Sequence, residues 1–141
     1  LQFIIEKFNQ KIIDISNIEF PIFYISPDYK IDGNMCPTDR YLKGQYNIKY
    51  KRITLIQTYP AEMEQAIIHE LGHHIHNIWF NNQDFKWNDR MIYKIFGDYG
   101  ISTKEEKFAH IFQLCYMKSK SYYNKNEKEM IKLLKNFNKI N

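Results

Sequence analysis

The sequence has only two cysteines, and no apolar run approaches the roughly 18 residues needed to cross a membrane. Cys36 and Cys115 lie far apart and form no Cys-x-x-Cys pair, which excludes a zinc ribbon or a disulfide framework and leaves a single bridge open. We therefore expect a soluble protein with no membrane partner. Because the chain begins with Leu1, secretion after removal of a leader and a cytoplasmic location both stay open.

Strong charge of either sign is also missing. The 20 Lys and Arg against 16 Asp and Glu leave a net charge of +4, too little for a stripe that binds nucleic acid. Valine is absent, whereas Ile, Lys, Asn, Tyr and Phe make up more than half of the chain. This bias is typical of an AT-rich genome, so the lysines say little about a partner. A length of 141 residues with 44% hydrophobic residues predicts one domain over residues 1–141, and we expect a monomer.

Hydrophobic periodicity predicts an α+β fold with a short, mostly antiparallel sheet on a long helix and a largely helical C-terminal half. Because the first strand contains Pro21, we expect it at an edge or with a bulge. In the N-terminal half we expect a helix near 4–15, a strand at 18–26, a loop at 27–40 and hairpin strands at 44–48 and 52–57. In the C-terminal half we expect helices at 61–80, 89–96 and 102–118, a turn at 97–100, and a last helix whose apolar side packs on the core. Capping boxes at 102–105 and 126–129 open the last two helices.

Four histidines fall close together in the long predicted helix, and two of them form a His-Glu-x-x-His pattern with Glu70. His69 and His73 are four residues apart, so both imidazoles can point at one metal ion from one helix face. Glu70 lies about 100° around the helix from His69, where a general base could take a proton from a metal-activated water. His74 and His76 leave the helix at other angles, so we expect them at the surface or in support of a ligand. The pattern predicts a Zn²⁺ site.

Two histidines do not complete a catalytic zinc site, which ordinarily has three protein ligands and an open position. The chain lacks the His-x-x-Gly-x-x-His extension of the metzincins, so the third ligand must come from further along. The downstream candidates are Asp84, Asp89, Asp98, Glu105, Glu106 and His110. Because Glu106 and His110 share one helix face, we favour Glu106 as the ligand, with His110 supporting it or replacing it. Glu105 is assigned to the capping box and to the helix dipole.

A second segment, residues 99–112, reads Tyr-Gly-Ile-Ser-Thr-Lys-Glu-Glu-Lys-Phe-Ala-His-Ile-Phe. Together with His-Glu-Leu-Gly-His it resembles the gluzincin metallopeptidases, and more closely the family of the anthrax lethal factor catalytic domain and the Pro-Pro endopeptidases. The resemblance covers about residues 44–112. It implies that Glu106 is the third ligand and that Tyr99 steadies the oxyanion of the tetrahedral intermediate. Where that family has a second glutamate that orients a ligand histidine, this chain has His110, and Asp84, Asp89 or Asp98 would have to substitute.

These observations predict a zincin-like, zinc-dependent endopeptidase in which Glu70 is the general base. A peptide substrate is expected beside the strand edge of the hairpin at 44–57, with specificity set by the loops 27–40 and 81–88. Two alternatives stay open: an intracellular regulatory peptidase of a phage or mobile element that cleaves a repressor, and a non-catalytic, zinc-stabilised binding module. The intact Glu70 argues against the module, because a structural zinc site needs no base and closes its fourth position.

Overall fold

A computed structural model describes residues 2–26, 30–31, 34–35 and 44–140. Its helices are α1 (Gln2–Lys11), α2 (Pro60–Phe80), α3 (Asp89–Gly100), α4 (Lys104–Met117), the 3-10 turn η1 (Lys120–Tyr122) and α5 (Lys125–Ile140). Its strands are β1 (Ile22–Ser26), β2 (Lys30–Ile31), β3 (Asn34–Met35), β4 (Gly44–Asn47) and β5 (Arg52–Ile56). The fold is therefore α+β and mostly helical, as predicted. Over the described ranges, no helix is both long and apolar enough to span a bilayer.

The main sheet has three strands in the order β1-β5-β4. β4 and β5 form the predicted antiparallel hairpin, with Tyr46 opposite Ile53, but β1 runs parallel to β5, with Tyr24 opposite Thr54. The sheet is mixed, so the expectation of a mostly antiparallel sheet is wrong. The alternation of side chains is the same in parallel and antiparallel strands, so the sequence pattern does not distinguish them. The connection between β1 and the hairpin is long enough for β1 to pair with β5 in the parallel direction. β1 lies at an edge, as Pro21 predicts.

Part of the predicted loop 27–40 lies outside the described residues, and so does Cys36. Within that stretch, β2 and β3 form a short antiparallel pair. Cys115 is a free, buried thiol.

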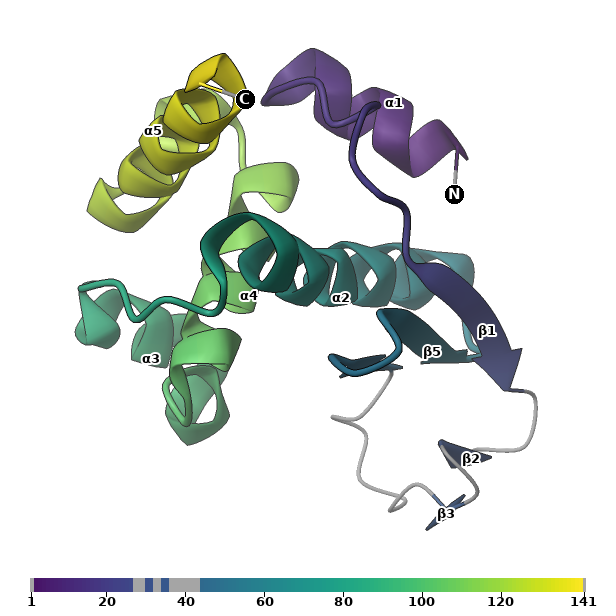
Figure 1. The fold of residues 1–141 in the computed structure, drawn as a ribbon. Helices are drawn as coiled ribbons and strands as arrows, with labels where there is room; N and C mark the ends of the chain where they lie inside the picture. The colour runs from purple at the N-terminus through teal and green to yellow at the C-terminus, as the bar shows by residue number, and fades with distance from the viewer. Residues whose placement is uncertain (1, 27–29, 32–33, 36–43, 141) are drawn as a thin grey trace.

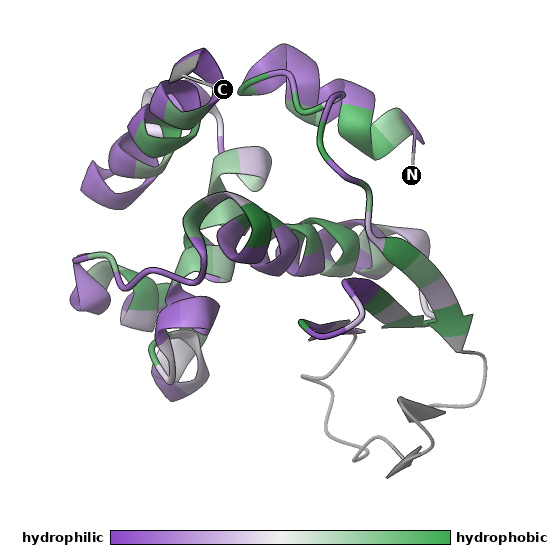
Figure 2. Ribbon diagram, viewed as in Figure 1, coloured by the Kyte–Doolittle hydropathy of each residue, from purple (hydrophilic) through white to green (hydrophobic). Residues whose placement is uncertain are grey.

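Helix α2 runs through the middle of the molecule, with the sheet on one side and the other helices around it (Figure 1). Pro60 stands in its first turn, and Asn81 ends it in the left-handed conformation with φ 49°. The side of α2 that holds Ile68, Leu71 and Ile75 is fully buried, and Figure 2 shows hydrophobic stretches along the helix. The helix predicted at 61–80 is confirmed. An apolar repeat of this length and period faces one side only when the chain is helical.

Helix α4 packs closely against α2 at Gly72. A Cβ on Gly72 would lie 3.1 Å from both the Cα of Ala109 and the Cβ of Phe112. The missing side chain therefore lets the two helices approach, which brings the first turn of α4 near the histidines. Phe112 also stacks on Phe8 of α1, with ring centroids 4.9 Å apart.

The two predicted capping boxes are shifted along the chain. Thr103 caps α4, its hydroxyl accepting from the backbone N–H of Glu106 at 3.0 Å, so Glu105 does not close a box with Ser102. In α5, the side chain of Asn124 accepts from the backbone N–H of Asn126. The carboxylate of Glu127 accepts in turn from the backbone N–H of Asn124. The box therefore starts two residues before the predicted 126–129.

The last helix packs on the core as expected, since Met130 and Leu134 are fully buried. Phe137 stacks on Trp79 at the end of α2, with ring centroids 4.6 Å apart.

Helix α3 contains a kink where a turn was predicted. Gly97 has φ 69° and ψ −155°, a conformation that favours glycine, and the chain resumes a helical turn up to Gly100. The kink lies two residues before Tyr99 and redirects the chain just ahead of it.

Candidate metal centre

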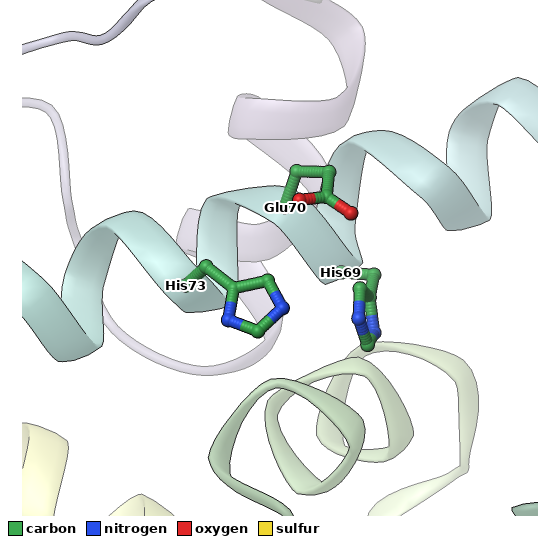
Figure 3. A group of neighbouring side chains, drawn as sticks. All are labelled: His69, Glu70 and His73. Carbon is green, nitrogen blue, oxygen red and sulfur yellow. The ribbon is translucent and has the colours of Figure 1, made fainter. Parts of the chain in front are cut away.

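The two histidines of the pattern and a carboxylate from another helix converge at one point. Figure 3 shows His69 and His73 leaving α2 side by side, with Glu70 on the turn between them. One carboxylate oxygen of Glu106 lies 2.9 Å from the Nε2 of His73, and the other lies 3.2 Å from the Nε2 of His69. Tetrahedral zinc ligands at 2.0–2.1 Å from the ion lie about 3.3 Å from one another. Glu106 is thus near this spacing from each of the two histidines.

The protonation of His69 points to a cation between these groups. Its Nδ1 lies 3.0 Å from the amide oxygen of Gln113, which can only accept, so Nδ1 carries a proton. Its Nε2 faces Glu106, and a nitrogen lone pair against a carboxylate oxygen is repulsive unless a proton or a metal ion lies between them. Burial would raise the pKa of Glu106, but its contacts with the rings of His69 and His73 lower it below its usual range. Glu106 is therefore ionised, as a zinc ligand must be.

Glu70 stands beside this cluster as a buried carboxyl. Burial raises its pKa to about 7, an effect that His69 reduces and Glu106 increases. Among the described residues its Oε2 has no hydrogen-bond partner. Gly44 of β4 leaves room for it, since a Cβ there would lie 3.1 Å from the Cγ of Glu70. A carboxyl with an unbonded oxygen and a pKa near 7 has the properties of a general base.

His110 lies beside Glu106 and is held to its backbone. Its Nδ1 donates to the backbone carbonyl of Glu106 at 2.7 Å and lies 3.7 Å from the nearer carboxylate oxygen. Burial, and then the charge of His69, lower its pKa to about 4, so it is neutral near pH 7. Binding an ion through Nδ1 would break the bond to the backbone. The contact thus opposes binding through Nδ1 and leaves both roles of His110, support of Glu106 and replacement of it, as predictions.

Tyr99 reaches the same centre from the end of α3. Its ring lies edge-on to His110, with centroids 5.5 Å apart. Burial, the charges of Glu106 and Glu70, and a hydrogen bond to Glu106 raise the pKa of Tyr99 above its usual range. The phenol therefore keeps its proton and can donate it in a hydrogen bond.

His74 and His76 are completely buried, so the expectation that they lie at the surface is wrong. The Nε2 of His74 donates to the backbone carbonyl of Glu19 at 2.6 Å, and its Nδ1 accepts from the hydroxyl of Tyr46 at 2.7 Å. His76 donates to the carbonyl of Gln83 and stacks on a phenylalanine of α4. Both face away from the metal centre, as their angles on the helix predict.

Within the described ranges, two groups have ligand atoms within 4.8 Å of one another: His69 with Glu70 and His73, and His69 with Glu106 and His110. The set of His69, His73 and Glu106 joins the two groups through the contacts of Glu106 with both histidines. The three aspartates proposed as ligands lie elsewhere. Asp84 and Asp98 are exposed, and Asp89 pairs with Lys107 at 3.0 Å.

Gln113 was missed by the sequence reasoning. It follows Glu106 by seven residues and His110 by three, so all three share one face of α4. That spacing was the available signal, but zinc sites in proteins use Cys, His, Asp and Glu, so zinc chemistry does not single out a glutamine.

An open cleft of about 200 Å³ leads to the centre. Residues 44–46 of β4 form one wall, and Glu70, His73, Tyr99 and Glu106 line the rest with their neighbours. Of the loops expected to set specificity, 81–88 contributes Asn82. Among the described strands β4 pairs only with β5, so its outer edge is open.

Compared with models of protein families, with curated proteins and with solved structures, the chain gives no match. Its function has to be argued from the geometry of the site.

Proposed function

We propose that this chain is a zinc-dependent endopeptidase of the gluzincin type, with a zincin-like fold. One observation carries the proposal: Glu106, from α4, meets the Nε2 atoms of both His69 and His73, while the buried Glu70 stands beside them. Two imidazoles, one carboxylate and a separate base are the parts that this chemistry requires.

His69, His73 and Glu106 would hold the ion. Zn²⁺ bound there would lower the pKa of a water to about 7 and polarise the scissile carbonyl. The remaining work falls to side chains of this protein.

Glu70 accepts the proton of the attacking water on its unbonded Oε2 and then gives it to the leaving amine. A pKa of about 7 suits both steps, because the group can hold and release a proton near neutral pH. Tyr99 donates its phenolic hydrogen to the carbonyl oxygen as that oxygen becomes negative. Its raised pKa keeps the hydrogen in place during this step.

A peptide substrate would lie along the open edge of β4. Backbone groups of an extended peptide can add to a free strand edge without regard to sequence. Residues 44–46 line the cleft beside Glu70 and His73, so such a peptide would pass the reacting groups.

The test combines metal analysis with digestion of a random peptide library. We expect the purified protein to bind one zinc ion and to cleave peptides, with both properties abolished in Glu106→Ala. Glu70→Gln should keep the zinc and lose cleavage. Glu129→Gln removes an exposed carboxylate on α5 and should keep both the zinc and cleavage.

Zinc binding without any cleavage would favour the alternative of a zinc-stabilised binding module. Cleavage retained in Glu70→Gln would reject the assignment of the base, and a protein that binds no zinc would reject the proposal as a whole.

A further inference from the structure

Gln113 is a buried amide held against a proposed zinc ligand. Its side chain is 8% exposed, and its Oε1 accepts from the Nδ1 of His69 at 3.0 Å. Its Nε2 donates to the sulfur of Met117 at 3.5 Å, which orients the amide with its oxygen toward the histidine. Both polar atoms of the side chain are thus used, and the stronger of the two bonds goes to His69.

This contact determines which nitrogen of His69 is available. With the proton fixed on Nδ1, the lone pair lies on Nε2, the atom that faces Glu106. A histidine ligand ordinarily donates its other ring N–H to a carboxylate, a carbonyl or a water, and that bond fixes both tautomer and ring direction. Gln113 is the group in this position for His69.

We propose that Gln113 is the positioning residue that holds His69 ready for zinc, and that it does so as a neutral acceptor. The inference rests on the metal site of the proposed function. An amide oxygen is a weaker hydrogen-bond acceptor than a carboxylate and raises the basicity of the imidazole less. The Nε2 of His69 therefore remains a weaker electron-pair donor to the ion.

Charge balance explains why an amide suits this place. Glu70 and Glu106 already bring two carboxyl groups to the centre, both poorly exposed, and a divalent ion balances two negative charges. In the metal-free protein a third carboxylate at position 113 would add a further buried negative charge without a partner, which is costly at low dielectric and is relieved when the ion binds.

The experiment measures zinc affinity by competition with a chelator in wild type, Gln113→Leu and Gln113→Glu. Leucine removes the acceptor at similar size, and we expect the affinity to fall by about 10- to 100-fold. Glutamate keeps the acceptor and adds charge, so its affinity should equal or exceed that of wild type. Gln65→Leu makes the same change at an exposed position of α2 and should leave the affinity unaltered.

A second measurement reads the imidazole directly. Nitrogen-15 NMR of the histidine rings in the metal-free protein should find the His69 proton on Nδ1 in wild type and Gln113→Glu, and a loss of this preference in Gln113→Leu. Both variants change the same buried position, but only Gln113→Glu keeps the acceptor. Zinc affinity and tautomer lost in Gln113→Leu and retained in Gln113→Glu would therefore be due to the missing acceptor.

The inference is overturned if the wild type binds zinc and Gln113→Leu binds it equally tightly. It is overturned as well if metal-free Gln113→Leu keeps the same His69 tautomer. It is also overturned if Gln113→Glu binds as weakly as Gln113→Leu. A wild type that binds no zinc would instead defeat the proposed function together with this extension of it.

Discussion

The buried carboxyl of Glu70 should make the metal-free protein less stable as the pH rises. Its pKa is raised from 4.5 to about 7 in the folded chain. Between these pH values the folded state holds a proton that the unfolded state has released, so the free energy of unfolding falls with pH and levels off above about 7. Each pKa unit corresponds to about 1.4 kcal/mol, so the whole difference amounts to about 3 kcal/mol.

Glu70→Gln keeps the shape of the side chain and removes the titration. We expect wild type and variant to unfold at similar urea concentrations at about pH 4.5, and the variant to be more stable by about 3 kcal/mol at about pH 8. Circular dichroism in the presence of a chelator measures both free energies. Other carboxyls and histidines titrate in both proteins and cancel in the difference.

Glu129→Gln provides the matched control, because it removes an exposed carboxylate from α5. Its stability relative to wild type should not change between the two pH values. A Glu70→Gln effect that is the same at both pH values, or a variant that is less stable at the higher pH, would refute the reasoning that burial opposes the charge on Glu70.

Three further substitutions test the packing and chemistry around the centre. Gly72→Ala should lower the free energy of unfolding in urea by about 1–3 kcal/mol, because its Cβ would lie 3.1 Å from the Cα of Ala109. Glycine to alanine inside a helix usually stabilises a protein by about 0.5–1 kcal/mol. Such a result here would show that α4 moves away to make room for the methyl group. Tyr46→Phe leaves the buried Nδ1 of His74 without its donor and should cost about 1–3 kcal/mol in the same assay, and an unchanged stability would contradict the hydrogen bond. Tyr99→Phe should leave zinc affinity unchanged but lower kcat by about 100-fold, and an unchanged kcat would remove Tyr99 from the mechanism.

The sequence predicted well those elements whose local pattern is compatible with only one secondary structure. Helix α2 combines a long apolar repeat with Pro60 at its start, and the 44–57 hairpin alternates across a short polar turn. The capping boxes were misplaced because several neighbouring residues can cap a helix. Ser102 and Thr103 both offer a hydroxyl, and the structure uses Thr103. The carboxylate of Glu106, three residues later, faces the histidines instead of closing a box.

The candidate site divides in the same way. His69, Glu70 and His73 belong to one helix, so their relative directions follow from its geometry. Glu106 could be proposed because carboxylates bind zinc, although its approach depends on how α4 packs at Gly72. Gln113 could not be proposed from ligand chemistry, because its role is to accept a hydrogen bond from a residue on another helix. Such partners depend on tertiary contacts that no spacing within one segment contains.

His73 and His74 illustrate how neighbouring residues of one type acquire different functions. One step along α2 turns the side chain by about 100°, so His73 faces Glu106 while His74 faces Tyr46 and the chain before β1. The hydrogen bond from the Tyr46 hydroxyl to His74 holds β4 against α2, and the same strand places Gly44 against Glu70. His74 thus supports the wall of the cleft and the position of the base at once. A change that loosens β4 should therefore disturb both peptide binding and the pKa of Glu70, even though it touches no metal ligand.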